Sequence, residues 1–200
     1  MRTLVYSLAL AAGLALAACS MTPPASAELM TWPDLLERPR PAADAEIHYG
    51  DNQLQVVDLW LPKGKGPHPT VLMVHGGCWQ TEIADRRIMN WIADDLRKRG
   101  IAVWNIDYRG VDRTGGGYPG TFLDAAAATD ALRDHAARYR LDISRLVAVG
   151  HSAGGHLALW LAGRSRLPTD SALRHGTPLP IATVISLGGL PDLEEAARPP

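Results

Sequence analysis

Residues 150–154 read Gly-His-Ser-Ala-Gly, between an apolar run at 147–149 and a segment from 156 to 161 with apolar residues at helical spacing. A G-x-S-x-G turn between a strand and a helix lifts the serine hydroxyl clear of the sheet, and its glycines avoid the Cβ clashes of so tight a turn. Ser152 is therefore a candidate nucleophile. The alternative is a glycine-rich turn whose serine is only solvated.

A second glycine-rich stretch, His-Gly-Gly-Cys-Trp at 75–79, follows the apolar run 71–74. Attack of a serine on an acyl carbonyl creates an oxyanion, and each pre-aimed backbone N–H donor lowers the barrier by about 3 kcal/mol. We expect these donors to be the N–H of Ala153 together with that of Gly77 or Cys78. The Cys78 thiol has no obvious base among its sequence neighbours, so we interpret it as a small loop residue rather than a second nucleophile.

These two motifs together resemble the α/β-hydrolase family, and within it the small serine carboxylesterases and the kynurenine formamidase-like branch. The resemblance covers about residues 45–195. It implies an α/β fold with a mostly parallel sheet, and hydrolysis of a small-molecule carboxylic ester through an acyl-enzyme on Ser152. It implies no cofactor and no metal. Hydrolysis of an amide, as by an arylformamidase, is the alternative.

The histidines do not follow the family pattern, in which the triad runs Ser, then Asp or Glu, then His. Only His156 and His175 follow Ser152 in the sequence, and no histidine follows the acidic residues near the C-terminus. We expect the His156 side chain to face away from the turn, and His175 is a weak candidate for the base. His75 and His151 precede the serine, so we expect them to brace the two turns.

Asp107 also precedes Ser152, so we expect it to fix a loop rather than serve as the triad acid. The resemblance then implies that the acid and the histidine of the triad are absent, with the C-terminal strands that would carry them. The strand expected at 181–187 would be an uncovered hydrophobic edge. We expect this chain to be an incomplete hydrolase, inactive by itself. The second hypothesis is a non-catalytic envelope lipoprotein that uses the scaffold for binding.

Hydrophobic patterning predicts the elements that position these residues. They are a hairpin at 45–61, strands at 70–74, 101–106, 147–149 and 181–187, and helices at 83–99, 121–139 and from 156. Thr121 and Asp124 predict a capping box at the start of the second helix. Because strands alternate with helices, we expect a parallel sheet with helices on both faces around one core.

Composition excludes several other classes of function. The chain has 200 residues, 46% of them hydrophobic, and a net charge of −1. It can bury one sizeable core, and because it has no basic patch we expect no nucleic-acid partner. Its two cysteines provide neither a disulfide framework nor a zinc ligand set.

The N-terminal residues indicate export. Residues 1–18 combine a basic residue with an apolar stretch of the length of a secretory signal peptide. Leu-Ala-Ala-Cys at 16–19 resembles a bacterial lipobox, which implies lipidation of Cys19 and a membrane anchor at the periplasmic or outer-membrane face. Residues 19–44 are then expected to be a proline-containing tether without regular structure, ahead of an incomplete hydrolase domain at 45–200. Cleavage after Ala27, giving a soluble secreted protein, is the alternative.

Overall fold

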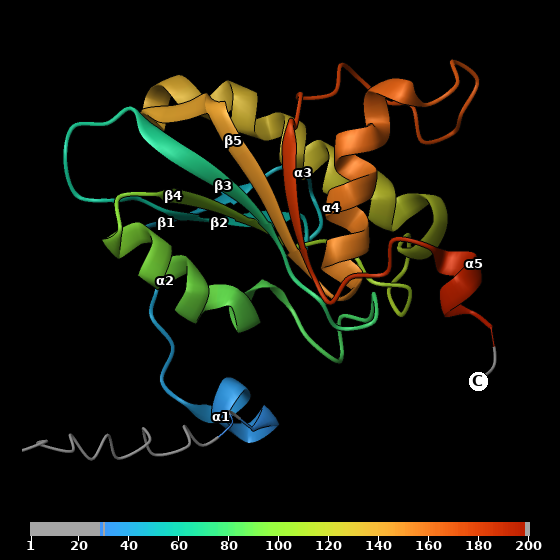
Figure 1. Ribbon diagram of the computed structural model, residues 1–200, viewed down its shortest axis with the longest axis horizontal. Coiled ribbons are helices and arrows are strands. Elements are labelled where there is room, and N and C mark those ends of the chain that lie inside the picture. The colour runs from blue at the N-terminus through green and yellow to red at the C-terminus, as the bar shows by residue number, and fades with distance from the viewer. Residues whose placement is uncertain (1–28, 30, 199–200) are drawn as a thin grey trace, which may run out of the picture.

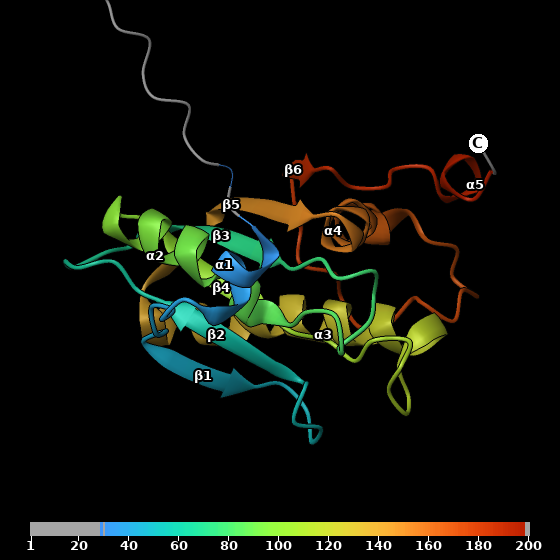
Figure 2. The same ribbon diagram turned by 90° about the horizontal axis from the view of Figure 1, so that it is seen from below.

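The computed structural model describes residue 29 and residues 31–198, and these residues form one six-stranded sheet in the order β1-β2-β4-β3-β5-β6 (Figure 1). The strands are β1 (Ala45–His48), β2 (Val56–Trp60), β3 (His68–Val74), β4 (Ala102–Ile106), β5 (Leu141–His151) and β6 (Thr183–Leu187). The β1–β2 hairpin joins β4 in antiparallel fashion, and β3 to β6 run parallel. Figure 2 shows β1 and β6 at opposite edges. The predicted α/β fold with a mostly parallel sheet is confirmed.

Helices cover both faces of this sheet. The α-helices are α1 (Trp32–Glu37), α2 (Asn90–Lys98), α3 (Gly117–Tyr139), α4 (Ala153–Gly163) and α5 (Leu193–Ala196), and short 3₁₀ helices span Arg86–Met89 and Arg164–Arg166. In Figure 1, α2 lies to the lower left of the sheet, and α3 and α4 lie to its upper right. None of the described helices is both long and apolar enough to cross a membrane.

Alternate residues of β3 supply two hydrophobic cores. Leu72 and Val74 belong to the core under α3 and α4, whereas Val71 and Met73 belong to the core under α2. Successive side chains of a strand point to opposite faces, so a strand covered on both sides is apolar throughout. The continuous apolar run that ends at the glycine-rich stretch 75–79 is therefore the central part of the sheet.

The alanine-rich helix α3 packs closely on the sheet, as expected. Ala125 and Ala128 are fully buried, and the indole N–H of Trp104 donates to the Ala128 carbonyl at 2.8 Å. The predicted capping box at its start is wrong. The helix begins earlier, at Gly117, whose N–H donates to the Thr121 hydroxyl, and Asp124 instead pairs with a distant arginine.

The helix predicted at 83–99 also begins later than its sequence pattern indicates. A 3₁₀ helix at Arg86–Met89 leads into α2 at Asn90. The Asp85 side chain caps this 3₁₀ helix by accepting from the N–H of Arg87. Residues 81 and 82 lie just before the predicted start, in a loop whose N–H groups donate to the Asp112 carboxylate.

Residues 31–37 correct the predicted unstructured tether. Thr31 and Asp34 form a capping box around α1, and Pro33 lies in its first turn. Leu35 packs against the core under α2. The predicted signal peptide and Cys19 lie outside the described residues.

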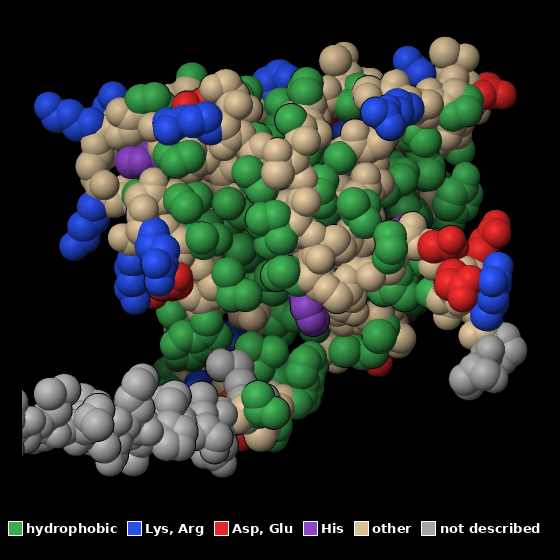
Figure 3. Space-filling view, viewed as in Figure 1, with side chains coloured by type: hydrophobic (Ala, Val, Ile, Leu, Met, Phe, Trp, Pro, Cys, Tyr) green, Lys and Arg blue, Asp and Glu red, His purple; other side chains and the backbone are tan. Residues whose placement is uncertain are grey.

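The edge strand β6 exposes hydrophobic side chains. Ile185 is 47% exposed and Leu187 is 42% exposed, whereas Val184 packs against the core under α4. Ile185 lies beside Val149 in the parallel register, on the α2 side of the sheet. Figure 3 shows hydrophobic side chains gathered near the middle of the face seen in Figure 1. The expected exposed hydrophobic edge is present, although the strand starts at 183 rather than 181.

Candidate active site

Ser152 lies in a strained turn between β5 and α4. Its φ of 52° and ψ of −121° place a non-glycine residue in a region that L-residues rarely adopt. A Cβ on Gly150 would lie 2.1 Å from the Gly154 carbonyl oxygen, so only glycine fits there. The Ser152 N–H donates to the Leu187 carbonyl at 2.9 Å. The turn predicted from the G-x-S-x-G motif is therefore formed, with its serine at the apex.

The loop after β3 has an equally unusual backbone. Gly77, Cys78 and Trp79 have consecutive positive φ values of 113°, 52° and 56°. A Cβ built on Gly76 would lie 3.1 Å from the Ser152 Cβ. The structure thus places the two glycine-rich motifs in direct contact, although more than 70 residues separate them in the sequence.

Three backbone donors next to this contact are unsatisfied. The N–H groups of Gly77, Cys78 and Ala153 have no hydrogen-bond partner within the described part of the chain. Ala153 is the first residue of α4, where N–H groups are free and the helix dipole favours negative charge. These are the donors expected from the sequence, and together they could bind an oxyanion.

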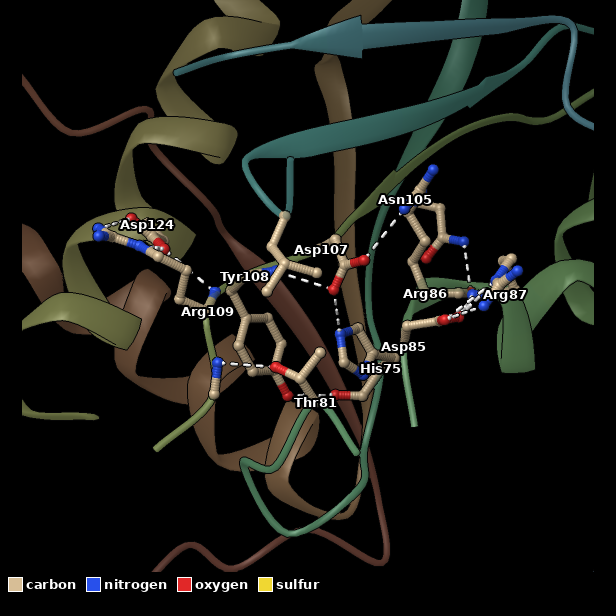
Figure 4. A network of polar contacts seen from close by, with 12 residues as sticks. His75, Thr81, Asp85, Arg86, Arg87, Asn105, Asp107, Tyr108, Arg109 and Asp124 are labelled. Atoms are coloured by element: carbon tan, nitrogen blue, oxygen red, sulfur yellow. Dashed lines mark hydrogen bonds and ion pairs between the residues drawn. The ribbon is translucent and has the colours of Figure 1, made fainter. Parts of the chain in front are cut away.

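A buried network fixes the start of this loop (Figure 4). The Nε2 atom of His75 lies 3.0 Å from Oδ1 of Asp107, and Nδ1 lies 2.7 Å from the carbonyl oxygen of Gly76. The His75 ring stacks on Tyr108, whose hydroxyl donates to the His75 carbonyl at 3.0 Å. Asp107 also accepts from Arg86 at 3.0 Å. His75 braces its turn and Asp107 fixes the loop, as the sequence predicts.

Arg86 ties this network to the first hairpin. Its guanidinium donates to Glu46 at 2.7 Å, and its Nε lies 2.9 Å from Asp58 without hydrogen-bond alignment. Burial raises the pKa of the Asp58 carboxyl, and Arg86 opposes that shift. Burial disfavours the charged form of Arg86, but Asp58 and Asp107 outweigh burial and hold the pKa of Arg86 above its usual value. Strands β1, β2 and β4 are thereby joined to the loop through one cation.

Asp112 holds the outer half of the loop. Its carboxylate accepts from the N–H of Thr81 at 2.9 Å and from that of Glu82 at 3.0 Å. Burial alone would raise the pKa of Asp112, but these backbone donors outweigh it and lower that pKa. No sequence pattern pointed to Asp112, because its partners lie about 30 residues away.

Arg109 connects the same region to α3. Its guanidinium makes two hydrogen bonds of 2.7 Å to the Asp124 carboxylate, which also accepts from Gln55 at 2.8 Å. Asp124 is buried. Bidentate pairs of this kind fix orientation as well as charge, so the loop after β4 is rigid on both sides of Tyr108.

An apolar pocket of about 420 Å³ opens beside the loop. Its main lining residues are aromatic or aliphatic: Trp79, Tyr118, Phe122, His156, Leu190 and Leu193. The His156 ring meets Trp79 and Phe122 edge-on, at centroid distances of 5.5 and 5.7 Å. Burial lowers the pKa of His156, so its ring is neutral near pH 7. The His156 ring therefore packs in this pocket, between Trp79 and Phe122.

The base that would activate Ser152 is not identified by the geometry. Within residues 31–198, no histidine ring or carboxylate is hydrogen-bonded to the Ser152 hydroxyl. His175 accepts a hydrogen bond from Arg164 at 3.0 Å through its backbone carbonyl, and not through its ring. Cys78 is a free, exposed thiol. The described residues include no group of three or more side chains that could hold a metal ion.

A comparison with family models identifies the chain. The model named BD-FAE matches residues 57–198. The chain belongs to the BD-FAE family. The match runs from β2 to just beyond α5, so it includes both glycine-rich motifs and the polar networks between them.

Relatives of this BD-FAE chain are esterases by name. It is 34% identical over 119 residues to the probable isoprenylcysteine alpha-carbonyl methylesterase ICMEL1 of Arabidopsis thaliana, covering 59% of this chain and 24% of the relative. It is 27% identical over 157 residues to the esterase LipC of Mycobacterium tuberculosis, covering 76% of this chain and 38% of the relative. The chain thus spans less than half of either relative.

Solved structures show the same fold. An esterase from Thermogutta terrifontis, Est2, superposes with a TM-score of 0.63 at 23% identity, covering 74% of this chain and 54% of the other. A bacterial heroin esterase matches with a TM-score of 0.56 at 28% identity, covering 71% of this chain and 43% of the other. The BD-FAE chain therefore has the α/β-hydrolase fold of these esterases.

Proposed function

We propose that this BD-FAE chain hydrolyses a small-molecule carboxylic ester through an acyl-enzyme on Ser152. The observation that carries the proposal is the contact between the two motifs. The Cβ position of Gly76 lies 3.1 Å from the Ser152 Cβ, and the N–H groups of Gly77, Cys78 and Ala153 are free beside it. The esterase names of the relatives support the same chemistry.

The reaction follows from this arrangement. The Ser152 oxygen attacks the ester carbonyl, the carbonyl electrons move to oxygen, and the N–H donors stabilise the resulting negative charge. The alcohol leaves with a proton, and water then releases the acid from Ser152. A base must take the hydroxyl proton, and no described residue is placed to do so. Because losing one triad member costs about four to six orders of magnitude in kcat, we expect this 200-residue chain by itself to react slowly.

The neighbouring pocket indicates which substrates fit. Its walls are apolar, and burial lowers the pKa of its one histidine, His156, so that this ring is mostly neutral near pH 7. An uncharged acyl or alcohol group would lose little hydration free energy on entering, whereas a carboxylate would lose much more. An arylformamidase-type amide hydrolase is the alternative, and faster turnover of an N-formyl anilide than of a phenyl ester would favour it.

Reaction with an uncharged fluorophosphonate probe tests the nucleophile. We expect the folded chain to be labelled at Ser152, at a rate roughly three or more orders of magnitude below that of an esterase with a complete triad. Peptide mapping by mass spectrometry identifies the labelled residue. Ser152→Ala should lose the label, and Ser186→Ala, the matched control, should keep it. If the folded chain takes no label at Ser152, the non-catalytic binding hypothesis is favoured instead.

We also propose that the protein is exported and anchored by lipid on Cys19. The support is the resemblance of residues 16–19 to a lipobox after an apolar stretch. In a bacterial host, Cys19→Ala should move the protein from the membrane pellet to the soluble fraction, and Cys78→Ala should leave it in the pellet. Equal sedimentation of Cys19→Ala and wild type would contradict lipid anchoring. If the intact mass is that of a chain beginning at residue 28, the soluble secreted alternative is supported.

A further inference from the structure

The His75 ring presents both of its nitrogens to oxygen atoms. It is 2% exposed, with Nδ1 2.7 Å from the Gly76 carbonyl and Nε2 3.0 Å from the Asp107 carboxylate. A carbonyl oxygen can only accept, so Nδ1 must carry a proton. The neutral ring has a single N–H. Nε2 then faces Asp107 with a bare lone pair unless a second proton lies between the two residues.

The surroundings of Asp107 decide which partner carries that second proton. Its Oδ1 accepts the Tyr108 N–H at 3.0 Å, and its Oδ2 accepts from Arg86 at 3.0 Å. These donors form stronger hydrogen bonds to an ionised Asp107 than to a protonated one, so they favour the carboxylate. We propose that His75 is an imidazolium at neutral pH, paired with Asp107, and that this buried cation positions the oxyanion loop.

Two carboxylates, a neutral phenol and one paired cation lie around the ring. From the segment after β4 come Asp107 and Tyr108, and burial raises the pKa of Tyr108, so that its ring stays neutral. From the 3₁₀ helix and its cap come Arg86 and Asp85. Arg86 is itself paired with Asp58, Glu46 and Asp107, so its charge is offset.

The proton on Nδ1 has a direct structural consequence for the loop. The Nδ1–H bond fixes the direction of the Gly76 carbonyl, which belongs to the same peptide unit as the N–H of Gly77. A trans peptide is planar and its C=O and N–H point in opposite directions. His75 therefore directs the Gly77 N–H away from the network. That this N–H serves an oxyanion rests on the proposed function, whereas the protonation state of the ring does not.

Nitrogen NMR of the histidine rings in the full chain tests the proposal. At about pH 8 both ring nitrogens of His75 should carry a proton, as the two hydrogen bonds of the ring require. Loss of the signals in His75→Asn assigns them. A His75 ring with one bare nitrogen at that pH would overturn the proposal. The measurement needs no turnover, so failure of Ser152 to react would leave its result unaffected.

A variant of the counter-ion separates charge from packing. In Asp107→Asn, His75 should lose the proton on Nε2 at about pH 8, because the carboxylate that stabilises the imidazolium is gone. Asp124→Asn, which removes another buried carboxylate, should leave the His75 ring doubly protonated. A doubly protonated ring in Asp107→Asn would contradict the pairing. If Asp107→Asn does not fold, the wild-type spectrum decides.

Discussion

Replacing Gly154 with alanine should destabilise the chain by at least about 3 kcal/mol and disrupt the contact between the two motifs. The added Cβ would lie 2.2 Å from the Val74 carbonyl oxygen and 2.3 Å from that of His75. Both are backbone atoms, at the end of β3 and the start of the loop that follows it, so neither can move without shifting the main chain. Helix α4 would have to shift away from the sheet, and Ser152 would move with it. Urea unfolding followed by circular dichroism measures the loss.

The same helix offers a matched control. A Cβ on Gly163, at the end of α4, meets no atom within 4 Å. Because alanine favours helix over glycine, Gly163→Ala should be neutral or stabilising by up to about 1 kcal/mol. Equal unfolding midpoints for the two variants would show that the turn around Ser152 tolerates a side chain at Gly154, which the close approach to β3 does not predict.

Replacing Arg86 with methionine should cost about 3–5 kcal/mol at neutral pH, the usual effect of leaving a buried charge without its partner. Methionine keeps much of the side-chain volume, so the loss reports charge rather than a cavity. The buried Asp58 would then lose its cationic partner, and Asp107, 1% exposed, would be left with His75 as its one basic side-chain partner. Arg87→Met is the control, because that side chain is 61% exposed and its pair with Asp85 should contribute only about 0–1 kcal/mol.

The pH dependence of this variant has a definite sign. Burial already raises the pKa of Asp58, and removing Arg86 raises it further. A carboxyl whose pKa is higher in the folded state favours folding below its unfolded pKa and loses that stability as the pH rises through the folded pKa. The loss of unfolding free energy in Arg86→Met, relative to wild type, should therefore shrink as the pH falls toward about 4. If that loss of unfolding free energy stays constant between pH 7 and about pH 4, lost packing rather than unpaired charge causes it.

The elements and motifs that the sequence predicts correctly depend on neighbouring residues. The apolar run before His75 and the glycines around Ser152 are local patterns, and each dictates its own strand or turn. Their meeting follows from the parallel sheet, because the carboxyl ends of β3 and β5 lie at the same edge. The location of the candidate site could thus be predicted from about a dozen residues.

The supports of the site could not be predicted in this way. Arg86 finds Glu46 and Asp107 at sequence separations of 40 and 21 residues, and no local pattern selects those partners. Asp124 matched a capping box, but its bidentate pair with Arg109 is the stronger interaction. His156 is a similar case, because its ring packs on Trp79 and Phe122, which come from distant parts of the sequence.

The bond from the Ser152 N–H to the Leu187 carbonyl gives the edge strand a second role. Leu187 ends β6, whose outer edge is unpaired within the described residues and whose side chains are mostly exposed. An edge strand opens more readily than a central one, and each opening of β6 would release the nucleophile's own backbone. The orientation of Ser152 is thus coupled to the least protected strand of the sheet, and any segment that covers β6 would also hold the serine in place.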